Sequence, residues 1–141
     1  FVAAGPLAWI HAALGATHHA HAFVVACDMP FLRIEPIALL LRYVGDADAV
    51  IPWWEGDIEP LHAVYKTSLR PRIARALEQG VTAIRDLLPL LRVSYVPESL
   101  MRSCAGAEEA FRNVNTPEDA FRFSIQVNPE GDLIDGVRPA K

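Results

Sequence analysis

The sequence has few cysteines and no surplus of positive charge. Its 141 residues include two cysteines, and its 13 lysines and arginines are outnumbered by 17 aspartates and glutamates, which gives a net charge of −4. Cys27 lies in an apolar run and Cys104 in a segment of small residues, so we expect reduced thiols in a cytoplasmic protein instead of a disulfide framework. The scattered basic residues do not suit a phosphate backbone, so we expect no nucleic-acid partner.

The sequence also lacks a long apolar run. The opening stretch FVAAGPLAWIHAALGA has no basic leader and no span of roughly 18 apolar residues, so it predicts neither a signal peptide nor a membrane helix. Because Phe1 is not a methionine, we expect that the chain is cut or misassigned upstream. What the sequence does contain is 52% hydrophobic and 21% charged residues, a composition typical of one folded domain with one core.

Apolar spacing and capping residues predict that helices and strands alternate along the chain. Gly5 and Pro6 suit the start of a helix that ends near Gly15. Helices are expected over residues 6–15, 36–44, 70–79 and 82–91, and strands over residues 23–27, 49–52, 61–65 and 92–97. This alternation predicts an α/β fold with a mostly parallel sheet and right-handed crossovers.

An acidic residue follows the apolar run at residues 23–27. That run is apolar at every position and rich in valine, as in a strand covered on both faces of a parallel sheet. Asp28 then stands where the strand ends, and Pro30 turns the chain away, because the residue before a proline avoids the helical region. Taken alone, Asp28 is equally well explained as a solvated turn residue.

Two asparagines precede a strong helix start near the end of the chain. In NVNTPEDAF, Thr116 suits an N-cap and Pro117 the first helical position, so a helix is expected there. Asn113 and Asn115 would then stand on the loop after a strand, at the edge where open α/β sheets bind ligands. Formation of Asx turns is their alternative role. The tail over residues 124–141 predicts a hairpin around NPEGD or a mobile segment.

Histidines and tryptophans elsewhere are weaker candidates. His18, His19 and His21 could bind a transition metal, but they lie in a polar segment and a solvated loop is favoured. Trp53 and Trp54 would point to opposite faces of a strand, so at most one could stack on a ligand, and packing is favoured for both.

Three polar residues near the strand expected over residues 61–65 complete the candidates. His62 could act as a general acid or base near neutral pH, but a structural histidine is favoured. Asp57 and Glu59 could supplement a metal site, but turn residues are favoured.

Five stretches together resemble a known family. AGPLAWIHAAL, VVACDMPFL, EPLHAVY, LEQGVTAIRDLL and FRNVNTPEDAF occur in the order and rough spacing of the molybdenum cofactor guanylyltransferases, the MobA-like nucleotidyltransferases. The resemblance covers residues 5–123. It implies a Rossmann-like three-layer nucleotidyltransferase fold that lacks its first strand and glycine-rich loop. The domain would occupy residues 1–123, followed by the tail over residues 124–141.

The resemblance implies a reaction in which GMP passes from GTP to the terminal phosphate of molybdopterin and pyrophosphate leaves. By the same resemblance, Asp28 is the catalytic aspartate that binds Mg²⁺, with Mn²⁺ as a substitute, and contacts the nucleotide. Gly5 matches a family position close to the nucleotide, where its helix would present free N–H groups to an anion. Asn113 and Asn115 match asparagines near the acceptor. GTP and molybdopterin are then the substrates, and delivery to a molybdoenzyme or its chaperone is expected.

The sequence departs from the family pattern in three respects. Trp9 stands where the family usually has glycine, and its indole could either crowd a ligand or pack against neighbouring helices. The glycine-rich nucleotide loop with its following lysine is not matched, and neither is the acidic residue that reads guanine.

Two other functions therefore stay open. The first is transfer of a cytidylyl group to the same cofactor, or of a guanylyl group to another small molecule. The second is a non-catalytic domain that binds molybdopterin without transferring anything.

Overall fold

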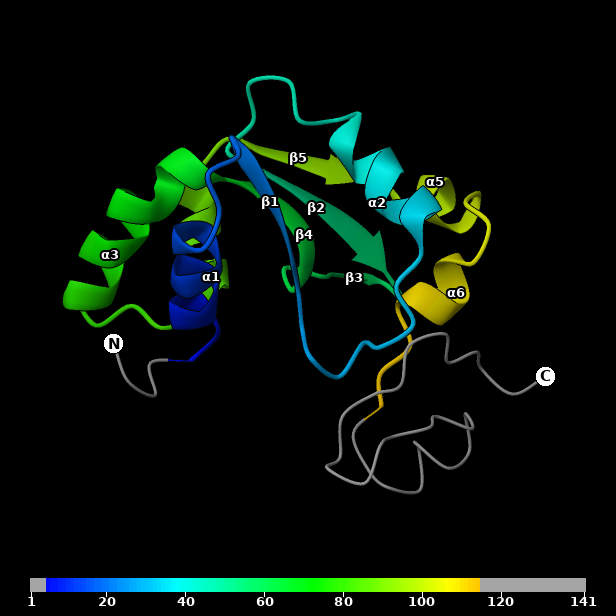
Figure 1. Ribbon diagram of the computed structural model, residues 1–141, viewed down its shortest axis with the longest axis horizontal. Helices are drawn as coiled ribbons and strands as arrows, with labels where there is room; N and C mark the ends of the chain where they lie inside the picture. Colours follow the sequence, from blue (N-terminus) through cyan, green and yellow to red (C-terminus); the bar gives the residue numbers. More distant parts are fainter. Residues whose placement is uncertain (1–4, 115–141) are drawn as a thin grey trace.

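The computed structural model describes residues 5–114, and in this part of the chain a β-sheet lies between two groups of helices (Figure 1). The group on one face comprises α1 (Pro6–Gly15), α3 (Arg70–Glu78) and α4 (Ile84–Leu87). The group on the other face comprises α2 (Ile34–Leu41), α5 (Glu98–Arg102) and α6 (Ala107–Ala110). Short 3-10 helices, η1 (Thr67–Leu69) and η2 (Leu88–Leu90), adjoin α3 and α4. This arrangement confirms the predicted three-layer α/β fold.

Within the described residues the sheet has five strands. They are β1 (His21–Val25), β4 (His62–Lys66), β2 (Ala49–Trp54) and β3 (Asp57–Ile58) in spatial order, with β5 (Val93–Val96) paired to β2. The pairing of β2 with β5 is parallel, whereas β1 with β4, β4 with β2, and β2 with β3 pair antiparallel. The prediction of a mostly parallel sheet is therefore wrong for the part of the chain that the structure describes.

The short connection between β2 and β4 explains this difference. Only residues 55–61 join the two strands, whereas a parallel pair needs a crossover of a dozen residues or more. Strands β1 and β2, which are connected by α2, do run in the same direction. They are not paired with each other, because β4 lies between them in the sheet. A run of apolar residues indicates that both faces of a strand are covered by other elements. An antiparallel strand between two helix layers is covered in the same way, so the run does not distinguish parallel from antiparallel pairing.

Proline and glycine explain most helix boundaries. Pro6 occupies the first turn of α1, and α3 ends just before Gly80, as the sequence predicts. The helix expected over residues 82–91 is instead divided into α4 and η2, because Pro89 has no N–H with which to continue an α-helix.

Alternate residues of β2 face opposite helix layers. Ala49 and Ile51 belong to the core beneath α1, α3 and α4, whereas Val50 and Trp54 belong to the core beneath α2, α5 and α6. Trp53 is 39% exposed, so the two tryptophans do point to opposite faces. The molecule thus has two apolar cores separated by the sheet, instead of the one core expected.

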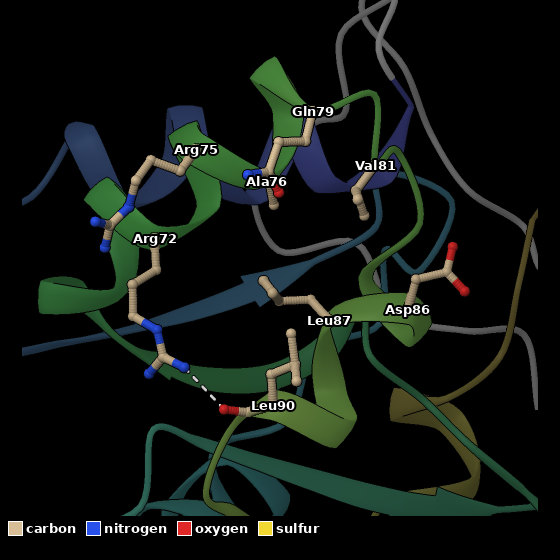
Figure 2. A pocket seen from close by; sticks show the side chains of 8 residues that line it. All are labelled: Arg72, Arg75, Ala76, Gln79, Val81, Asp86, Leu87 and Leu90. Carbon is tan, nitrogen blue, oxygen red and sulfur yellow. Dashed lines mark hydrogen bonds between the residues drawn. The ribbon is translucent and has the colours of Figure 1, made fainter.

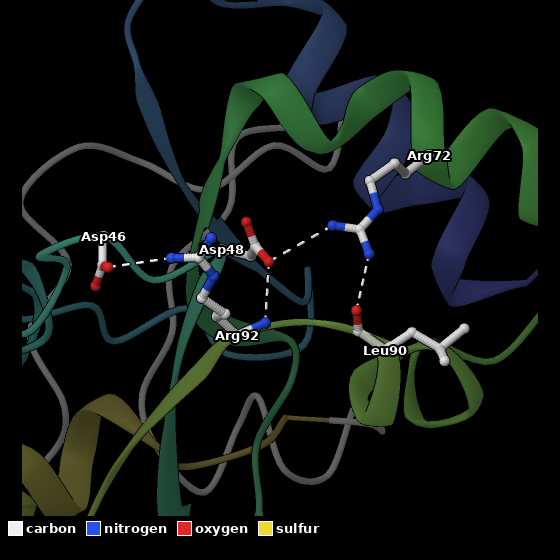
Figure 3. A network of polar contacts seen from close by, with 5 residues as sticks. All are labelled: Asp46, Asp48, Arg72, Leu90 and Arg92. Atoms are coloured by element: carbon white, nitrogen blue, oxygen red, sulfur yellow. Dashed lines mark hydrogen bonds and ion pairs between the residues drawn. The ribbon is translucent and has the colours of Figure 1, made fainter.

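A polar network joins α3 to the starts of β2 and β5 (Figure 3). The carboxylate of Asp48 accepts a hydrogen bond from the backbone N–H of Arg92 at 2.9 Å and lies 3.6 Å from the guanidinium of Arg72. Arg72 also donates to the carbonyl of Leu90 at 2.8 Å, and Arg92 pairs with Asp46 at 3.1 Å. Asp48 therefore connects a helix, a loop and a strand through one side chain.

Some predictions fall outside the described residues. The helix expected after Thr116, the residue Asn115, and the domain boundary at residues 123–124 all lie there. Among the helices of residues 5–114, none has the length and apolar character that spanning a bilayer requires.

Candidate functional site

Asp28 lies in a tight turn directly after β1. The Ala26 N–H donates to the carbonyl of Leu61 at 2.9 Å, and the Met29 N–H donates back to the carbonyl of Ala26 at 3.2 Å. Met29 and Phe31 are 6% and 7% exposed, so two apolar side chains anchor the turn. The turn thus holds Asp28 at the carboxyl end of β1, as the sequence predicts.

One oxygen of Asp28 has no hydrogen-bond partner among residues 5–114. Its Oδ1 atom is buried, and no described residue donates a hydrogen bond to it. A buried acceptor without a donor costs free energy, roughly 1–3 kcal/mol for a neutral group and more for a charged one. Oδ1 is therefore an unsatisfied acceptor within the described residues, unlike the oxygen of a solvated turn residue.

The segment that carries Asn113 lies beside Asp28. The backbone N–H of Val114 donates to the backbone carbonyl of Asp28 at 2.6 Å, and the Asn113 side chain is exposed next to that contact. The segment follows α6, so the expectation that it follows a strand is wrong, because α5 and α6 occupy the chain after β5. Asn113 nevertheless reaches the carboxyl edge of β1, where a ligand was expected.

The start of α1 has little capacity left for an anion. The Leu7 N–H donates to the carbonyl of Thr82 at 3.1 Å, the Ala8 N–H donates to the carbonyl of Gly5 at 3.1 Å, and Pro6 has no N–H. The expectation of free N–H groups in this turn is therefore wrong. The backbone of Gly5 has a φ of 77°, and a Cβ at this position would lie 3.4 Å from the carbonyl oxygen of Thr82. The local backbone structure therefore explains why a glycine occupies this position. Its proximity to a nucleotide stays a prediction.

Two further carboxylates stand on the connection between β2 and β4. Asp57 forms a bidentate pair with Arg85 at 3.1 and 3.2 Å, and this pairing holds the pKa of Asp57 below its usual range. Glu59 is half-buried, and its pKa is raised by burial first and then by the negative charge of Asp57. Asp28 also raises the pKa of Glu59, whereas Arg85 lowers it, so the carboxylates of Glu59 and Asp28 lie within electrostatic range of each other.

His62 is part of a column of rings and is a structural residue, as predicted. It is 0% exposed, with the Phe23 ring at 5.0 Å edge-on and the Phe111 ring stacked at 4.1 Å. Burial lowers its pKa from 6.5 to about 4, and no residue in the described part of the chain forms a hydrogen bond with either ring nitrogen. The column continues as Phe111 stacks on Trp54 at 4.4 Å and the guanidinium of Arg102 lies 4.2 Å over Trp54.

Phe111 is a residue of this region that the sequence pattern does not single out. This residue is 4% exposed and directly precedes the segment of residues 112–114, so the ring column fixes where that segment approaches Asp28. The only signal in the sequence is one aromatic residue ahead of two asparagines, which does not identify its neighbours.

The remaining candidates do not form a site. His18 and His19 are exposed and His21 lies in β1, and residues 5–114 contain no group of three or more histidine, cysteine, aspartate or glutamate side chains placed to hold a metal. This agrees with the solvated loop favoured for His18 and His19. Trp9 is 61% exposed, so most of its side chain faces solvent instead of packing against neighbouring helices.

A pocket of about 370 Å³ lies between α3 and the α4–η2 segment (Figure 2). Its lining residues are Arg72, Arg75, Ala76, Gln79, Val81, Asp86, Leu87 and Leu90. None of the predicted site residues lines this pocket, and Arg72 is already engaged with the carbonyl of Leu90.

The residues around Asp28 fit a divalent cation that also binds phosphate. Mg²⁺ usually takes one or two carboxylates and completes its octahedron with waters and phosphate oxygens, so it does not need a cage of three protein ligands. Oδ1 of Asp28, which has no hydrogen-bond partner among the described residues, would be one such hard oxygen. Mn²⁺ accepts the same oxygen ligands.

A three-layer α/β fold with an available carboxylate at the carboxyl end of a strand is typical of proteins that bind phosphorylated ligands at the edge of the sheet. The chain belongs to the family described as the MobA-like NTP transferase domain, whose sequence model matches residues 1–94.

Individual relatives agree with this family. The chain is 40% identical over 121 residues to a protein of Pelotomaculum thermopropionicum described as a probable molybdenum cofactor guanylyltransferase, covering 86% of this chain and 59% of the relative. It is 36% identical to the molybdenum cofactor guanylyltransferase of Desulfosudis oleivorans, covering 82% of this chain and 57% of the relative. The chain thus spans less than two thirds of the length of these curated relatives.

Solved structures confirm the predicted nucleotidyltransferase fold. The crystal structure of molybdopterin-guanine dinucleotide biosynthesis protein A from Archaeoglobus fulgidus matches with a TM-score of 0.70 and 37% identity, over 84% of this chain and 60% of that chain. A protein of Aquifex aeolicus matches at 20% identity with a TM-score of 0.65, over 79% of this chain and 57% of that chain, and supports the fold alone. The expected loss of a first strand and glycine-rich loop stays a prediction.

Proposed function

We propose that this protein transfers GMP from GTP to molybdopterin, forming the guanine dinucleotide of the cofactor and releasing pyrophosphate. Family membership and the names of the relatives support the reaction class, the nucleotide and the acceptor. The observation that carries the proposal is the hydrogen bond from Val114 to Asp28, because it joins the expected cation ligand to the segment that bears Asn113.

Asp28 would hold the divalent cation through its unpartnered Oδ1. Both substrates are polyanions, and when bound, a cation of this kind neutralises phosphate charge and helps to align the triphosphate. The protein contributes a rigid turn, since the hydrogen bonds of Ala26 and Met29 fix the backbone on either side of Asp28. No side-chain nucleophile is needed, because the attacking oxygen belongs to the acceptor phosphate.

Asn113 would contact the acceptor. Its side-chain amide is exposed and has both donors and an acceptor, which suits a phosphate or a pterin ring. Stacking of Phe111 on His62 and Trp54 holds the preceding residues in place, so Asn113 is presented at a defined distance from Asp28. Orientation of two reactants in this way accounts for a large part of the rate of a phosphoryl transfer.

The test follows pyrophosphate release and dinucleotide formation with GTP, molybdopterin and Mg²⁺. We expect Asp28→Asn to lower the rate by roughly a hundredfold or more, because a metal ion contributes several kcal/mol to charge stabilisation. Asp57→Asn is the matched control, since it removes a carboxylate that already pairs with Arg85. Its rate should stay close to that of the unaltered protein.

Three outcomes would contradict the proposal. Faster transfer from CTP than from GTP would indicate a cytidylyltransferase, and GTP consumption with another acceptor would indicate a different guanylyltransferase. Molybdopterin binding that needs no Mg²⁺ and survives Asp28→Asn, without any transfer, would indicate a binding domain.

A further inference from the structure

Two polar contacts attach the Asp28 loop, residues 26–33, to the part of the chain that follows β5. This loop joins β1 to α2 and passes beside α6 (Figure 1). The first contact is the hydrogen bond from the Val114 N–H to the Asp28 carbonyl at 2.6 Å. The second is made by Arg33, the last residue of the loop, whose Nη1 lies 3.5 Å from Oε2 of Glu109 in α6. Both contacts therefore join the same two stretches of chain.

The Arg33 side chain also packs against the start of α6. The side chains of Arg33 and Glu109 are 44% and 37% exposed, so their ion pair alone contributes little to stability. At Gly106, however, a Cβ would come within 2.6 Å of the Arg33 Cζ and 2.9 Å of its Cγ, so the arginine fills the space of a side chain there. Gly106 directly precedes α6 and has a φ of 75°, which favours glycine as well.

Apolar side chains anchor both stretches that Arg33 connects. Met29 and Phe31 of the Asp28 loop are 6% and 7% exposed, and Ala107 and Ala110 of α6 are 2% and 0% exposed. Each stretch is thus held by its own buried residues. The contacts between the two stretches then determine how they meet at the candidate site.

We propose that Arg33 is a positioning residue, which holds the Asp28 loop against α6 and so sets how Asn113 is presented to Asp28. The inference rests on the proposed function, in which Asp28 holds the cation and Asn113 contacts the acceptor. Arg33 acts through the loop and α6 and not through a substrate. Loss of its contacts should misplace the two sides of the site, and a small misplacement slows a transfer that depends on orientation.

Hydrogen exchange of the Val114 amide in the native 141-residue chain, without any substrate, tests the attachment. In Arg33→Ala we expect this exchange to be roughly threefold or more faster than the loss of global stability explains. Arg72→Ala is the matched control, since the Arg72 side chain is 41% exposed and lies 3.6 Å from Asp48 in the other helix layer. Its Val114 exchange should follow global stability only.

Gly106→Ala and Gly80→Ala separate the Arg33 contact from backbone strain. Both glycines have a positive φ, 75° and 85°, but a Cβ at Gly80 would meet nothing within 4 Å. We expect Gly106→Ala to accelerate Val114 exchange more than Gly80→Ala does. When Arg33→Ala is already present, the added effect of Gly106→Ala should shrink, because the atoms that a Cβ would displace are gone.

The GMP-transfer assay measures the positioning role, at a temperature at which circular dichroism shows every variant folded. Arg33→Ala should lower kcat by roughly tenfold while the KM for GTP changes less than about twofold, because the cation ligand is still present. Arg72→Ala should leave both constants within about twofold of the unaltered protein.

Equal acceleration of Val114 exchange by Arg33→Ala and Arg72→Ala would overturn the inference, as would additive effects of Arg33→Ala and Gly106→Ala. Faster exchange in Arg33→Ala with an unchanged kcat would also overturn it. The proposed function is scored separately. Faster exchange in Arg33→Ala, with no transfer by the unaltered protein, would uphold the attachment by Arg33 and reject the proposed function. Transfer by the unaltered protein, with Val114 exchange unaffected by Arg33→Ala, would do the reverse.

Discussion

Asp28 and His62 are two polar residues whose surroundings give them opposite roles. Asp28 has a buried oxygen that no described residue contacts through a hydrogen bond, in a turn that other backbone groups hold rigidly. His62 is enclosed between Phe23 and Phe111, and burial keeps it neutral near pH 7. Asp28 is therefore suited to bind a ligand, whereas His62 is suited only to packing in the core.

The buried state of His62 predicts acid sensitivity. Its pKa is lowered from 6.5 to about 4 in the folded chain, so the unfolded chain binds more protons between these values. The contribution of neutral His62 to stability is therefore fully present above about pH 6.5 and is lost as the pH falls toward 4. At pH 5 we expect a loss of about 2 kcal/mol in the free energy of unfolding.

Urea unfolding at pH 7.5 and pH 5 checks this expectation. His62→Leu should show a smaller difference between the two pH values than the unaltered chain, whatever its absolute stability. Phe23→Leu alters the same column without a titratable group, so it should destabilise about equally at both. An unchanged pH difference in His62→Leu would show that another group causes the acid sensitivity.

At the scale of elements, α3 is attached to the sheet by packing and by the Asp48 network. Ile73 and Leu77 of α3 lie in the first core, and Arg72 on the same helix lies 3.6 Å from Asp48. The Asp48 side chain is 19% exposed and also accepts the Arg92 N–H at the entrance to β5. One carboxylate thus sets the position of a helix relative to two parallel strands.

The Asp48 network predicts a difference between two aspartates of the same loop. Asp48→Ala removes a hydrogen bond to a backbone N–H and a partner of Arg72, so we expect a loss of roughly 1–2 kcal/mol. Asp46 pairs with Arg92 but its side chain is 91% exposed, and Asp46→Ala should cost less than about 0.5 kcal/mol. Chemical denaturation measures both, and equal losses would contradict the role given to Asp48.

The elements also show what periodicity predicts well and what it misses. The bounds of α1 and α3 follow from Pro6, Gly15 and Gly80, because caps and helix breakers act over a few residues. The direction of β4 does not follow from its own apolar pattern. It depends on the short turn after β2 and on pairing with β1, which joins residues far apart in the chain.

At the scale of the whole molecule, the ring column connects the second core to the Asp28 turn. It runs from Phe23 through His62 and Phe111 to Trp54, with Arg102 above it. The rings come from three strands and from the segment after α6. Packing in this core therefore determines how closely the segment of residues 112–114 approaches the site.

Phe111→Leu should weaken the contact between the segment of residues 112–114 and the Asp28 turn. The variant loses ring stacking, which contributes about 0.5–1.5 kcal/mol per aromatic pair beyond buried area, so we expect a lower free energy of unfolding. The Val114 N–H that donates to Asp28 should then exchange with solvent faster than the loss of global stability explains. Native-state hydrogen exchange measures this difference.

Ile73→Val is the matched control for Phe111→Leu. Ile73 is 0% exposed in the first core, on the other face of the sheet, and this substitution costs a similar 0.5–1.5 kcal/mol. Its Val114 exchange should follow global stability only. If both variants accelerate Val114 exchange equally, the ring column does not control the site.

The sequence by itself determined the family, the three-layer class, the bounds of α1 and α3, and the position of Asp28 at a strand end. These depend on short motifs and on residues within a few positions of one another, which a linear pattern records. Tertiary structure alone decided that β1 and β4 are antiparallel, that Val114 bonds to Asp28, and that Phe111 stacks between His62 and Trp54. Such features depend on which distant segments bury one another's apolar surface, and no local pattern contains that information.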